Sequence, residues 1–311
     1  MARNKVQFQK GLSLTAFLNE YGTEEQCLAA LEHWRWPNGF VCPKCGHDKA
    51  CLLTTHRLRQ CYGCRAQISV TAGTLFAKTK LPLTTWFLGI YLITQSKKGI
   101  SGLELSRQLG ISDNAAWRMK HKLMQAMMER DATKPLSGFV EIDDAFLGGE
   151  RSGGKTGRGA PGKTPFIAAV QTTEGHQPCA IKLSCLKGFR SGEIQSWATA
   201  SLLPGTTVIS DGLACFTAVT KADCAHDRIV CGGGKASVRE PEFYWVNTVL
   251  GNLKSALRST YHSISPKHAD RYLAEFVYRF NRRYDLGSMI ARLAFIALRT
   301  LPMPEKLLRL A

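Results

Sequence analysis

The sequence predicts an α/β protein that is preceded by a small zinc-binding module and a helical module. Two Cys-x-x-Cys pairs between residues 42 and 64 predict the first module, and capped helices around a glycine turn between residues 101 and 128 predict the second. From residue 137 onward, strand-like runs alternate with helical ones, as in an α/β layer. At 311 residues the chain is also longer than a single core usually supports, so we expect two or three domains.

The composition favours a polyanionic partner. Lys and Arg number 41 against 24 Asp and Glu, a formal net charge of +17, which is typical of proteins that bind nucleic acid or an anionic membrane. The uncharged stretch from Leu81 to Ser96 contains Thr and Gln and falls short of the ~20 apolar residues that span a bilayer. The N-terminus carries no apolar run of the secretory type. We therefore expect nucleic acid as the partner, no membrane, and a cytoplasmic location.

The cysteine pattern predicts a structural zinc site. Eleven cysteines in a chain expected to lie in a reducing compartment indicate metal ligands or buried thiols rather than disulfides. The pairs Cys42/Cys45 and Cys61/Cys64 have the spacing of a zinc ribbon, which is too small to fold without its metal. His47 and Cys51 are spare ligand candidates, although mere proximity to the site explains them more simply. The other cysteines lack paired spacing and are expected to be small core residues: Cys27, Cys179, Cys185, Cys215, Cys224 and Cys231.

The segments on either side of these cysteines have local signals of their own. Thr23 to Gln26 fits a capping box, and Pro37 to Gly39 ends the helix that this box begins. Three arginines lie on or beside the ribbon, where they suit contact with phosphates: Arg57, Arg59 and Arg65.

A helix-turn-helix pattern follows the ribbon. Ser101 to Glu104 fits a second capping box, and Gly110 to Ser112 form a turn into a longer helix from about Asp113 to Met128. Arg118 and Lys122 lie off the apolar stripe of that helix and are candidates for DNA contact. The alternative is an ordinary helical subdomain with a solvated basic face.

The run from Phe139 to Leu147 carries carboxylates inside an apolar strand. Because side chains alternate along a strand, Glu141 and Asp143 should point to one face while Val140 and Ile142 point to the other, into a core. The alternative is an amphipathic edge strand with a solvated acidic face.

A second β-rich run, Thr206 to Ser210, is followed by Asp211 and a glycine. Two strands that each carry an aspartate suggest one site, in which Asp143 and Asp211 meet at neighbouring strands and hold Mg²⁺ or Mn²⁺ for phosphoryl transfer. Between them we expect strands at 166–171 and 179–186 and a helix at 191–203. The glycine-rich loop 150–163 lacks a Walker A ending, and its Arg158 and Lys163 are candidates for contact with the nucleic-acid backbone.

These features divide the chain into four parts, with the polar segment from Asp131 to Pro135 as the main boundary. We assign residues 1–37 to an N-terminal helical segment, residues 38–75 to the zinc ribbon, residues 76–130 to a helix-turn-helix-like DNA-binding domain, and residues 137–300 to the α/β domain.

Several motifs together resemble one family. They are Cys42-Pro-Lys-Cys45-Gly-His47, Thr71-Ala-Gly-Thr74, Thr79-Lys-Leu-Pro-Leu83, Val140-Glu-Ile-Asp-Asp144, Ser210-Asp-Gly212 and the run from Arg271 to Arg283. The chain resembles, from about Tyr21 to Asp285, the bacterial insertion-sequence transposases of the DDE type with an N-terminal zinc ribbon, the ISXO2-like group. The resemblance implies that 137–300 is a ribonuclease-H-like catalytic domain that uses a divalent metal to cut and join DNA.

The resemblance also implies roles for individual residues. Asp143 matches the first catalytic acid of the family and Asp211 the second. Where many members have a glutamate seven residues before a lysine, this chain has Asn247 before Lys254, which resembles the Asp-Asp-Asn-Lys branch. Asn252 is the second candidate for that asparagine. An amide keeps an oxygen ligand but removes one negative charge, so the affinity for the metal should fall.

A further family signature is the set Glu275, Arg279 and Arg282 on one helix. Arg279 and Arg282 are candidates for DNA contact, and the alternative is a structural salt-bridged face.

The hypothesis from the sequence is a transposase that binds the terminal inverted repeats of an insertion sequence as a homodimer or higher assembly on double-stranded DNA. Two alternatives stay open. One is a catalytically inactive zinc-ribbon and helix-turn-helix DNA-binding protein derived from a transposase, which the missing third carboxylate supports. The other is a metal-dependent nuclease that cuts DNA without joining it.

Overall fold

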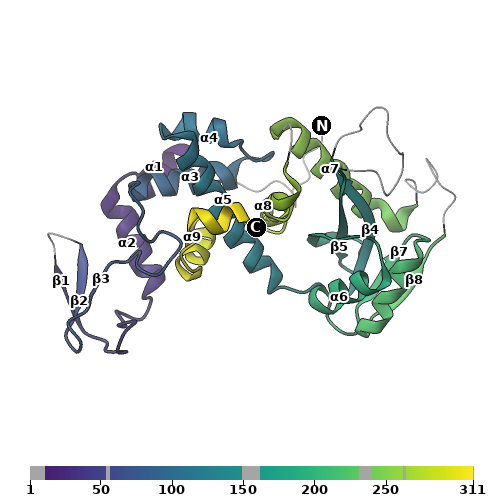
Figure 1. Cartoon of the computed structure of the whole chain (residues 1–311), viewed down its shortest axis with the longest axis horizontal. Helices are drawn as coiled ribbons and strands as arrows, with labels where there is room; N and C mark the ends of the chain where they lie inside the picture. Colours follow the sequence, from purple (N-terminus) through teal and green to yellow (C-terminus); the bar gives the residue numbers. More distant parts are fainter. Residues whose placement is uncertain (1–10, 54–56, 149–161, 231–239, 262–263, 311) are drawn as a thin grey trace. The chain divides into compact units, whose positions relative to one another are not determined.

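The computed structural model describes residues 11–53, 57–148, 162–230, 240–261 and 264–310 (Figure 1). The chain divides into two compact units. The first combines Met1–Ala126 with Tyr284–Leu310, and the second contains Met127–Arg283. Among the described residues, no helix is long and apolar enough to cross a membrane.

The first unit is mainly helical, and local caps begin several of its helices. The capping box at Thr23 is formed with Gln26, and the hydroxyl of Ser101 accepts the backbone N–H of Glu104 at 3.1 Å. Gly110 ends its helix in the left-handed conformation (φ +63°) that glycine favours. The helices are α1 (Leu14–Tyr21), α2 (Glu24–Arg35), α3 (Leu83–Gln95), α4 (Gly102–Leu109), α5 (Asp113–Ala132), α9 (Met289–Arg299) and α10 (Glu305–Leu310). Helix α5 begins in the first unit, and its last residues belong to the second.

The C-terminal helices differ from the sequence-based division. Residues from Tyr284 onward group with the first unit, although we had assigned the chain up to residue 300 to the α/β domain. The physical reason is the apolar face of α9, which packs against α2 and α3, while Leu75 N–H donates to Ala297 O at 3.1 Å.

The ribbon is a three-stranded antiparallel sheet in the order β1-β2-β3. Its strands are β1 (Ala50–Leu53), β2 (Leu58–Cys61) and β3 (Gln67–Ile68). Among the described residues of the ribbon, the buried core is formed by four side chains, those of Phe40, Cys42, Cys61 and Ile68. Two of these four are cysteines, so the apolar contribution to folding is small.

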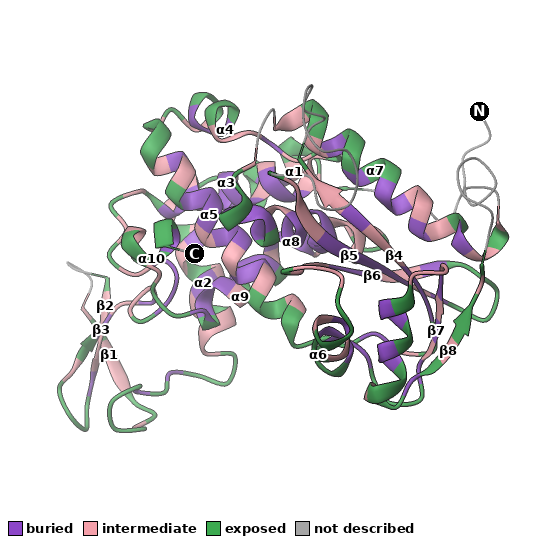
Figure 2. Cartoon of the chain, turned by 45° about the vertical axis from the view of Figure 1, so that its right-hand side comes forward, coloured by how far each residue is buried: buried purple, intermediate pink, exposed green. Residues whose placement is uncertain are grey.

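The second unit is built on a mixed five-stranded sheet in the order β6-β5-β4-β7-β8, whose strands are all labelled in Figure 2. Strand β4 pairs antiparallel with β5 and parallel with β7, so it lies at the centre of the sheet. The edge-strand alternative for β4 is therefore wrong. The strands are β4 (Phe139–Leu147), β5 (Thr164–Thr172), β6 (Pro178–Cys185), β7 (Thr207–Ser210) and β8 (Ala225–Arg228).

Each face of this sheet has its own core, and the central strands are largely buried (Figure 2). Val140 and Ile142 point toward α6 (Ser191–Ser201) and the 3₁₀ segment η2 (Ala214–Ala222). Ala145 packs on the opposite face. That face is covered by α7 (Tyr244–Thr260), which follows the short turn η4 (Pro241–Phe243), and by α8 (Ala269–Phe280), which follows η5 (Pro266–His268). The alternation predicted for β4 is thus observed.

Candidate active site

Three carboxylates converge where β4 and β7 run side by side. The parallel register sets Ile142 opposite Ser210, so the next residues, Asp143 and Asp211, are neighbours. Carboxylate oxygens of Asp143, Asp144 and Asp211 all lie within 4.8 Å of one another. The structure therefore brings together the two aspartates that the sequence singled out and adds Asp144, to which we had given no role.

Local hydrogen bonds orient two of these carboxylates. Asp143 Oδ1 accepts the backbone N–H of Asp144 at 2.8 Å. Asp211 Oδ1 accepts the N–H of Leu213 at 3.0 Å, which is the turn that an aspartate favours after a strand. Both aspartates are half-buried, so they are partly shielded from bulk water.

The electrostatics of the cluster suit a divalent cation. Burial raises the pKa of Asp143 to about 7, and the neighbouring charges of Asp144 and Asp211 act in the same direction. Like-charged carboxylates that are held together in this way are stabilised by a positive charge between them. The donors are hard oxygen atoms, with neither His nor Cys in the group, and this set fits Mg²⁺ or Mn²⁺ better than zinc.

Helix α7 brings the positively charged side chain of Lys254 close to this cluster. Lys254 is close enough to Asp143 for its charge to lower the pKa of that carboxyl, against the effect of burial. Asn247 precedes Lys254 by two turns on α7, so both lie on the same side of the helix, whereas Asn252 lies on nearly the opposite side. Asn247 is half-buried and Asn252 is exposed. The helix geometry therefore favours Asn247 over Asn252 as a neighbour of Asp143.

The start of α7 is held by a second acid of β4. Glu141 is 3% exposed, and its Oε2 atom accepts the backbone N–H groups of Trp245 at 3.1 Å and Val246 at 2.8 Å. Burial raises the pKa of Glu141 to about 7, while these two hydrogen bonds lower it. The strand periodicity had set Glu141 on the same side as Asp143, but nothing in the sequence pointed to its partners.

The four ribbon cysteines form the second group of side chains that could hold a metal ion. Their sulfur atoms lie within 4.8 Å of one another, with Sγ–Sγ distances of 3.6 Å for Cys42 and Cys64 and 3.5 Å for Cys45 and Cys61. Ligands at ~2.3 Å in a tetrahedron would be about 3.8 Å apart, so the cluster fits a structural zinc ion.

The spare candidates lie outside this cluster. His47 O accepts the N–H of Cys42 at 2.9 Å, and Cys51 Sγ contacts Gln60 O at 3.8 Å. Among the remaining cysteines, Cys27, Cys215 and Cys224 are buried, Cys179 and Cys185 are partly buried, and Cys231 lies outside the described residues.

Several arginines and lysines expected to contact DNA are engaged within the first unit. Arg59 makes a two-point contact with Glu32 at 2.7 and 3.1 Å, and Arg57 pairs with Glu25 at 2.7 Å. Lys122 Nζ donates to Leu75 O at 3.4 Å, and burial lowers its pKa. These contacts leave the predicted roles in DNA binding untested.

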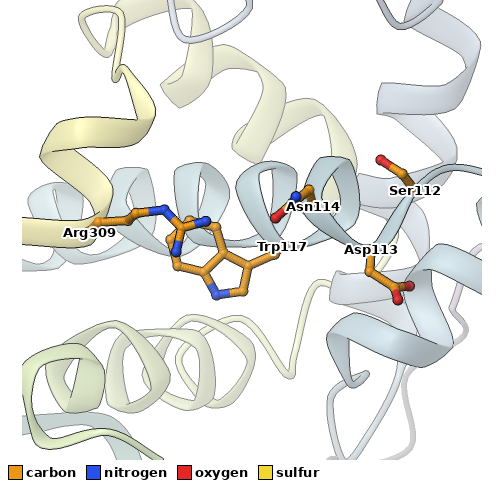
Figure 3. A pocket seen from close by; sticks show the side chains of 5 residues that line it. All are labelled: Ser112, Asp113, Asn114, Trp117 and Arg309. Atoms are coloured by element: carbon orange, nitrogen blue, oxygen red, sulfur yellow. The ribbon is translucent and has the colours of Figure 1, made fainter.

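Arg118 is held by the C-terminal helix. Its Nη1 atom lies 3.3 Å from Glu305 Oε2 on α10. Beside this pair, Arg309 of α10 stacks over the Trp117 ring at 4.9 Å and lines a surface pocket at the start of α5 (Figure 3). The pocket is also lined by Ser112, Asp113 and Asn114. Helix α10 therefore lies over the part of α5 that carries Arg118.

The signature on α8 forms a buried ion pair. Arg279 Nη1 lies 2.6 Å from Glu275 Oε1, and the two side chains are 10% and 1% exposed. Glu275 also accepts a hydrogen bond from the hydroxyl of Tyr261 at 2.9 Å. Arg282 stacks on the Tyr278 ring at 3.8 Å. This is the structural arrangement we had kept as an alternative, and contact of Arg279 and Arg282 with DNA stays a prediction.

Two further candidates belong to the glycine-rich loop. Lys163 is half-buried directly before β5, and Arg158 lies outside the described residues.

Two family models match the chain. One, described as an ISXO2-like transposase domain, matches residues 135–281, and the other, a transposase zinc-ribbon domain, matches residues 22–67. A curated relative is the uncharacterized protein in transposable element ISH50 of Halobacterium salinarum, which is 27% identical over 134 residues, or 42% of this chain and 44% of the relative. The match thus spans less than half the length of that relative.

A solved structure with some likeness is the Mos1 transposase paired-end complex with left transposon end. It is 10% identical over 67% of this chain and 78% of that chain, with a TM-score of 0.22. At this TM-score the likeness carries no argument about the fold or the function.

Proposed function

We propose that this chain, which matches an ISXO2-like transposase domain over residues 135–281 and a transposase zinc-ribbon domain over residues 22–67, binds the terminal inverted repeats of an insertion sequence, cleaves the DNA there and joins the ends to a target. The observation that carries the proposal is the carboxylate cluster of Asp143, Asp144 and Asp211 between β4 and β7. Oxygen ligands of this kind are what metal-dependent phosphoryl transfer requires.

The sheet topology supports a ribonuclease-H-like domain. Three antiparallel strands, β4 to β6, are followed by β7 and β8, which run parallel to β4 and extend the sheet beyond it. This order puts one aspartate within the central strand and the next directly after its parallel neighbour, which is where the family resemblance requires the first two catalytic acids.

In the proposed mechanism, Asp143 and Asp211 would hold Mg²⁺ or Mn²⁺, and Asn247, on the same side of α7 as Lys254, would be the third residue of the site. The divalent metal supplies the positive charge that an in-line displacement at phosphorus needs. Lys254 contacts a phosphate oxygen of the DNA as a point charge. Asn247 bears no charge, so the aspartates carry the negative charge that holds the cation.

Binding of duplex DNA is assigned to the first unit. We infer that α4, the turn at 110–112 and α5 act as a helix-turn-helix, with Arg118 and Lys122 at the DNA and the ribbon, folded by zinc, beside it. Arg158, Lys163, Arg279 and Arg282 are proposed as further DNA contacts. Two element ends have to be held together, so we propose a homodimer or higher assembly that acts on DNA in the cytoplasm.

The test is strand transfer with labelled DNA that carries both terminal repeats of the element, in Mn²⁺ or Mg²⁺. We expect joined products from the unaltered protein and none from Asp143→Ala. The matched control is Asp227→Ala, which removes an exposed aspartate of β8 and should leave joining intact. Cut ends without joining would reduce the function to that of a nuclease, and bound but uncut DNA would indicate a catalytically inactive DNA-binding protein.

A further inference from the structure

Helix α7 begins without a local side-chain cap. Its N-cap residue is Phe243, whose ring has no acceptor for the N–H groups that the first turn of a helix leaves unpaired. Glu141 supplies the acceptor instead, from a strand more than 100 positions earlier in the sequence, through its bonds to Trp245 and Val246. A carboxylate at this end of a helix is also favoured by the helix dipole.

Glu141 and Asp143 are alternate residues of the central strand and therefore share one side of it. The same strand thus carries both a metal-binding acid and the acceptor that fixes the start of the helix. Val246 directly precedes Asn247, and Lys254 on the same helix already acts electrostatically on Asp143. The place where α7 begins, together with the apolar contacts of α7 with the sheet, therefore sets where its catalytic candidates lie relative to Asp143.

We propose that Glu141 is a positioning residue: it anchors the first turn of α7 to β4 and thereby sets the distance from Lys254 and Asn247 to Asp143. The role of these residues in catalysis rests on the proposed function, whereas the anchor itself rests on the hydrogen bonds. Glu141 does not act on the DNA, because its carboxylate is buried and occupied by the helix.

The first measurement is amide hydrogen exchange in the metal-free protein. In the unaltered protein the N–H groups of Trp245 and Val246 should exchange slowly, and in Glu141→Ala at least tenfold faster. Glu141→Gln keeps a carbonyl oxygen in the same place and should stay close to the unaltered protein. If Glu141→Ala does not fold, Glu141→Asp can replace it. That variant shortens the side chain by one methylene and so withdraws the acceptor from the two N–H groups. Unchanged exchange at both amides in a folded Ala or Asp variant would overturn the proposal.

The second measurement is the affinity for Mn²⁺, which reports the position of Lys254 without any DNA. Removing a positive charge near the carboxylates in Lys254→Ala should tighten Mn²⁺ binding by about threefold. In a Glu141→Ala background the same change should have a clearly smaller effect, because the first turn of α7 is no longer fixed to β4 and position 254 is held less closely to Asp143. A threefold gain that persists there contradicts positioning and leaves Glu141 as a structural residue only.

The third measurement links the anchor to catalysis. Glu141→Ala should lower the rate of strand transfer at saturating DNA by at least tenfold with little change in KM for the DNA, and Glu141→Gln should restore most of it. The matched control is Glu242→Ala, which removes the next acid before α7 and should leave the rate unchanged. If the unaltered protein joins no DNA while exchange and Mn²⁺ binding behave as expected, the proposed function fails and the anchor stands. Normal joining by Glu141→Ala overturns the positioning role alone.

Discussion

At the scale of single residues, the candidate site depends on carboxylates that the fold forces together. Asp143 lies within a central strand, and its raised pKa records the burial and the nearby negative charges. Such a group destabilises the fold while it is charged and unpaired. A bound divalent cation reverses that effect, so the same residue is expected to weaken the metal-free protein and to strengthen the metal-bound one.

The variant Asp143→Asn tests whether the charge of Asp143 destabilises the metal-free protein. Because the pKa in the folded state, about 7, exceeds the unfolded value of ~3.9, the folded protein binds more protons, and its stability falls as the pH rises from about 4 to about 7. Asp143→Asn removes this loss and should raise the free energy of unfolding of the metal-free protein by about 1 to 3 kcal/mol at pH 8. At pH 5 the gain should be smaller. Thermal melting at the two pH values provides the measurement.

The control for this prediction is the response to Mn²⁺. The metal should raise the Tm of the unaltered protein, and more at pH 8 than at pH 6, because protons compete for the same oxygens. Asp143→Asn should lose most of the rise. An equal rise in both proteins would mean that Mn²⁺ binds elsewhere.

At the scale of elements, the contact of α10 with α5 bears on DNA binding. The pair of Arg118 and Glu305 is partly exposed, with side chains 46% and 36% accessible, so it contributes less than about 1 kcal/mol. The backbone of DNA carries many phosphate charges and attracts an arginine more strongly than one exposed carboxylate does. DNA can therefore displace a contact this weak. In the proposed complex with DNA, α10 would compete with phosphate for the Arg118 side chain.

We expect Glu305→Gln to tighten binding of duplex DNA by about two- to fivefold at low salt, because Arg118 is released from its acidic partner. Fluorescence anisotropy with a labelled element end measures the change. Arg118→Ala should weaken binding and reduce the slope of log K against log salt by about 1. The matched control is Glu174→Gln, which removes an exposed negative charge from a turn of the second unit. An equal gain in the control would assign the effect to net charge alone.

At the scale of the whole molecule, the features that could be predicted are those that depend on short-range patterns. The cysteine spacing predicted the four thiols that the structure brings together, and residue alternation predicted the two faces of β4, which the two separate cores confirm. Helices with side-chain caps, such as α2 and α4, were placed from their first residues.

What escaped prediction depends on contacts between distant parts of the chain. The anchoring of α7 by Glu141 and the packing of α9 with the first unit join segments separated by 100 or more positions, and no local period reveals them. Asp144 was missed for a different reason. Strict alternation places neighbouring residues on opposite faces, yet the carboxylate oxygens of Asp143 and Asp144 still reach the same site.

The division into two units also predicts how the molecule responds to the loss of zinc. The described residues of the ribbon bury four side chains, two of them cysteines, so we expect its folding free energy to come mainly from zinc, whereas the mixed sheet of the second unit has an apolar core on each face. In Cys61→Ser the bound zinc should fall from about one per chain to nearly none, and the ribbon should unfold while the second unit still melts cooperatively. Binding of the element ends should weaken at least tenfold, while Mn²⁺ binding at the carboxylates stays within twofold of that of the unaltered protein.

The control for the loss of zinc is Cys215→Ser, which alters a buried thiol outside the ribbon and should leave the bound zinc unchanged. Loss of Mn²⁺ binding in Cys61→Ser would show instead that the two units fold as one, and the zinc would then support the whole chain.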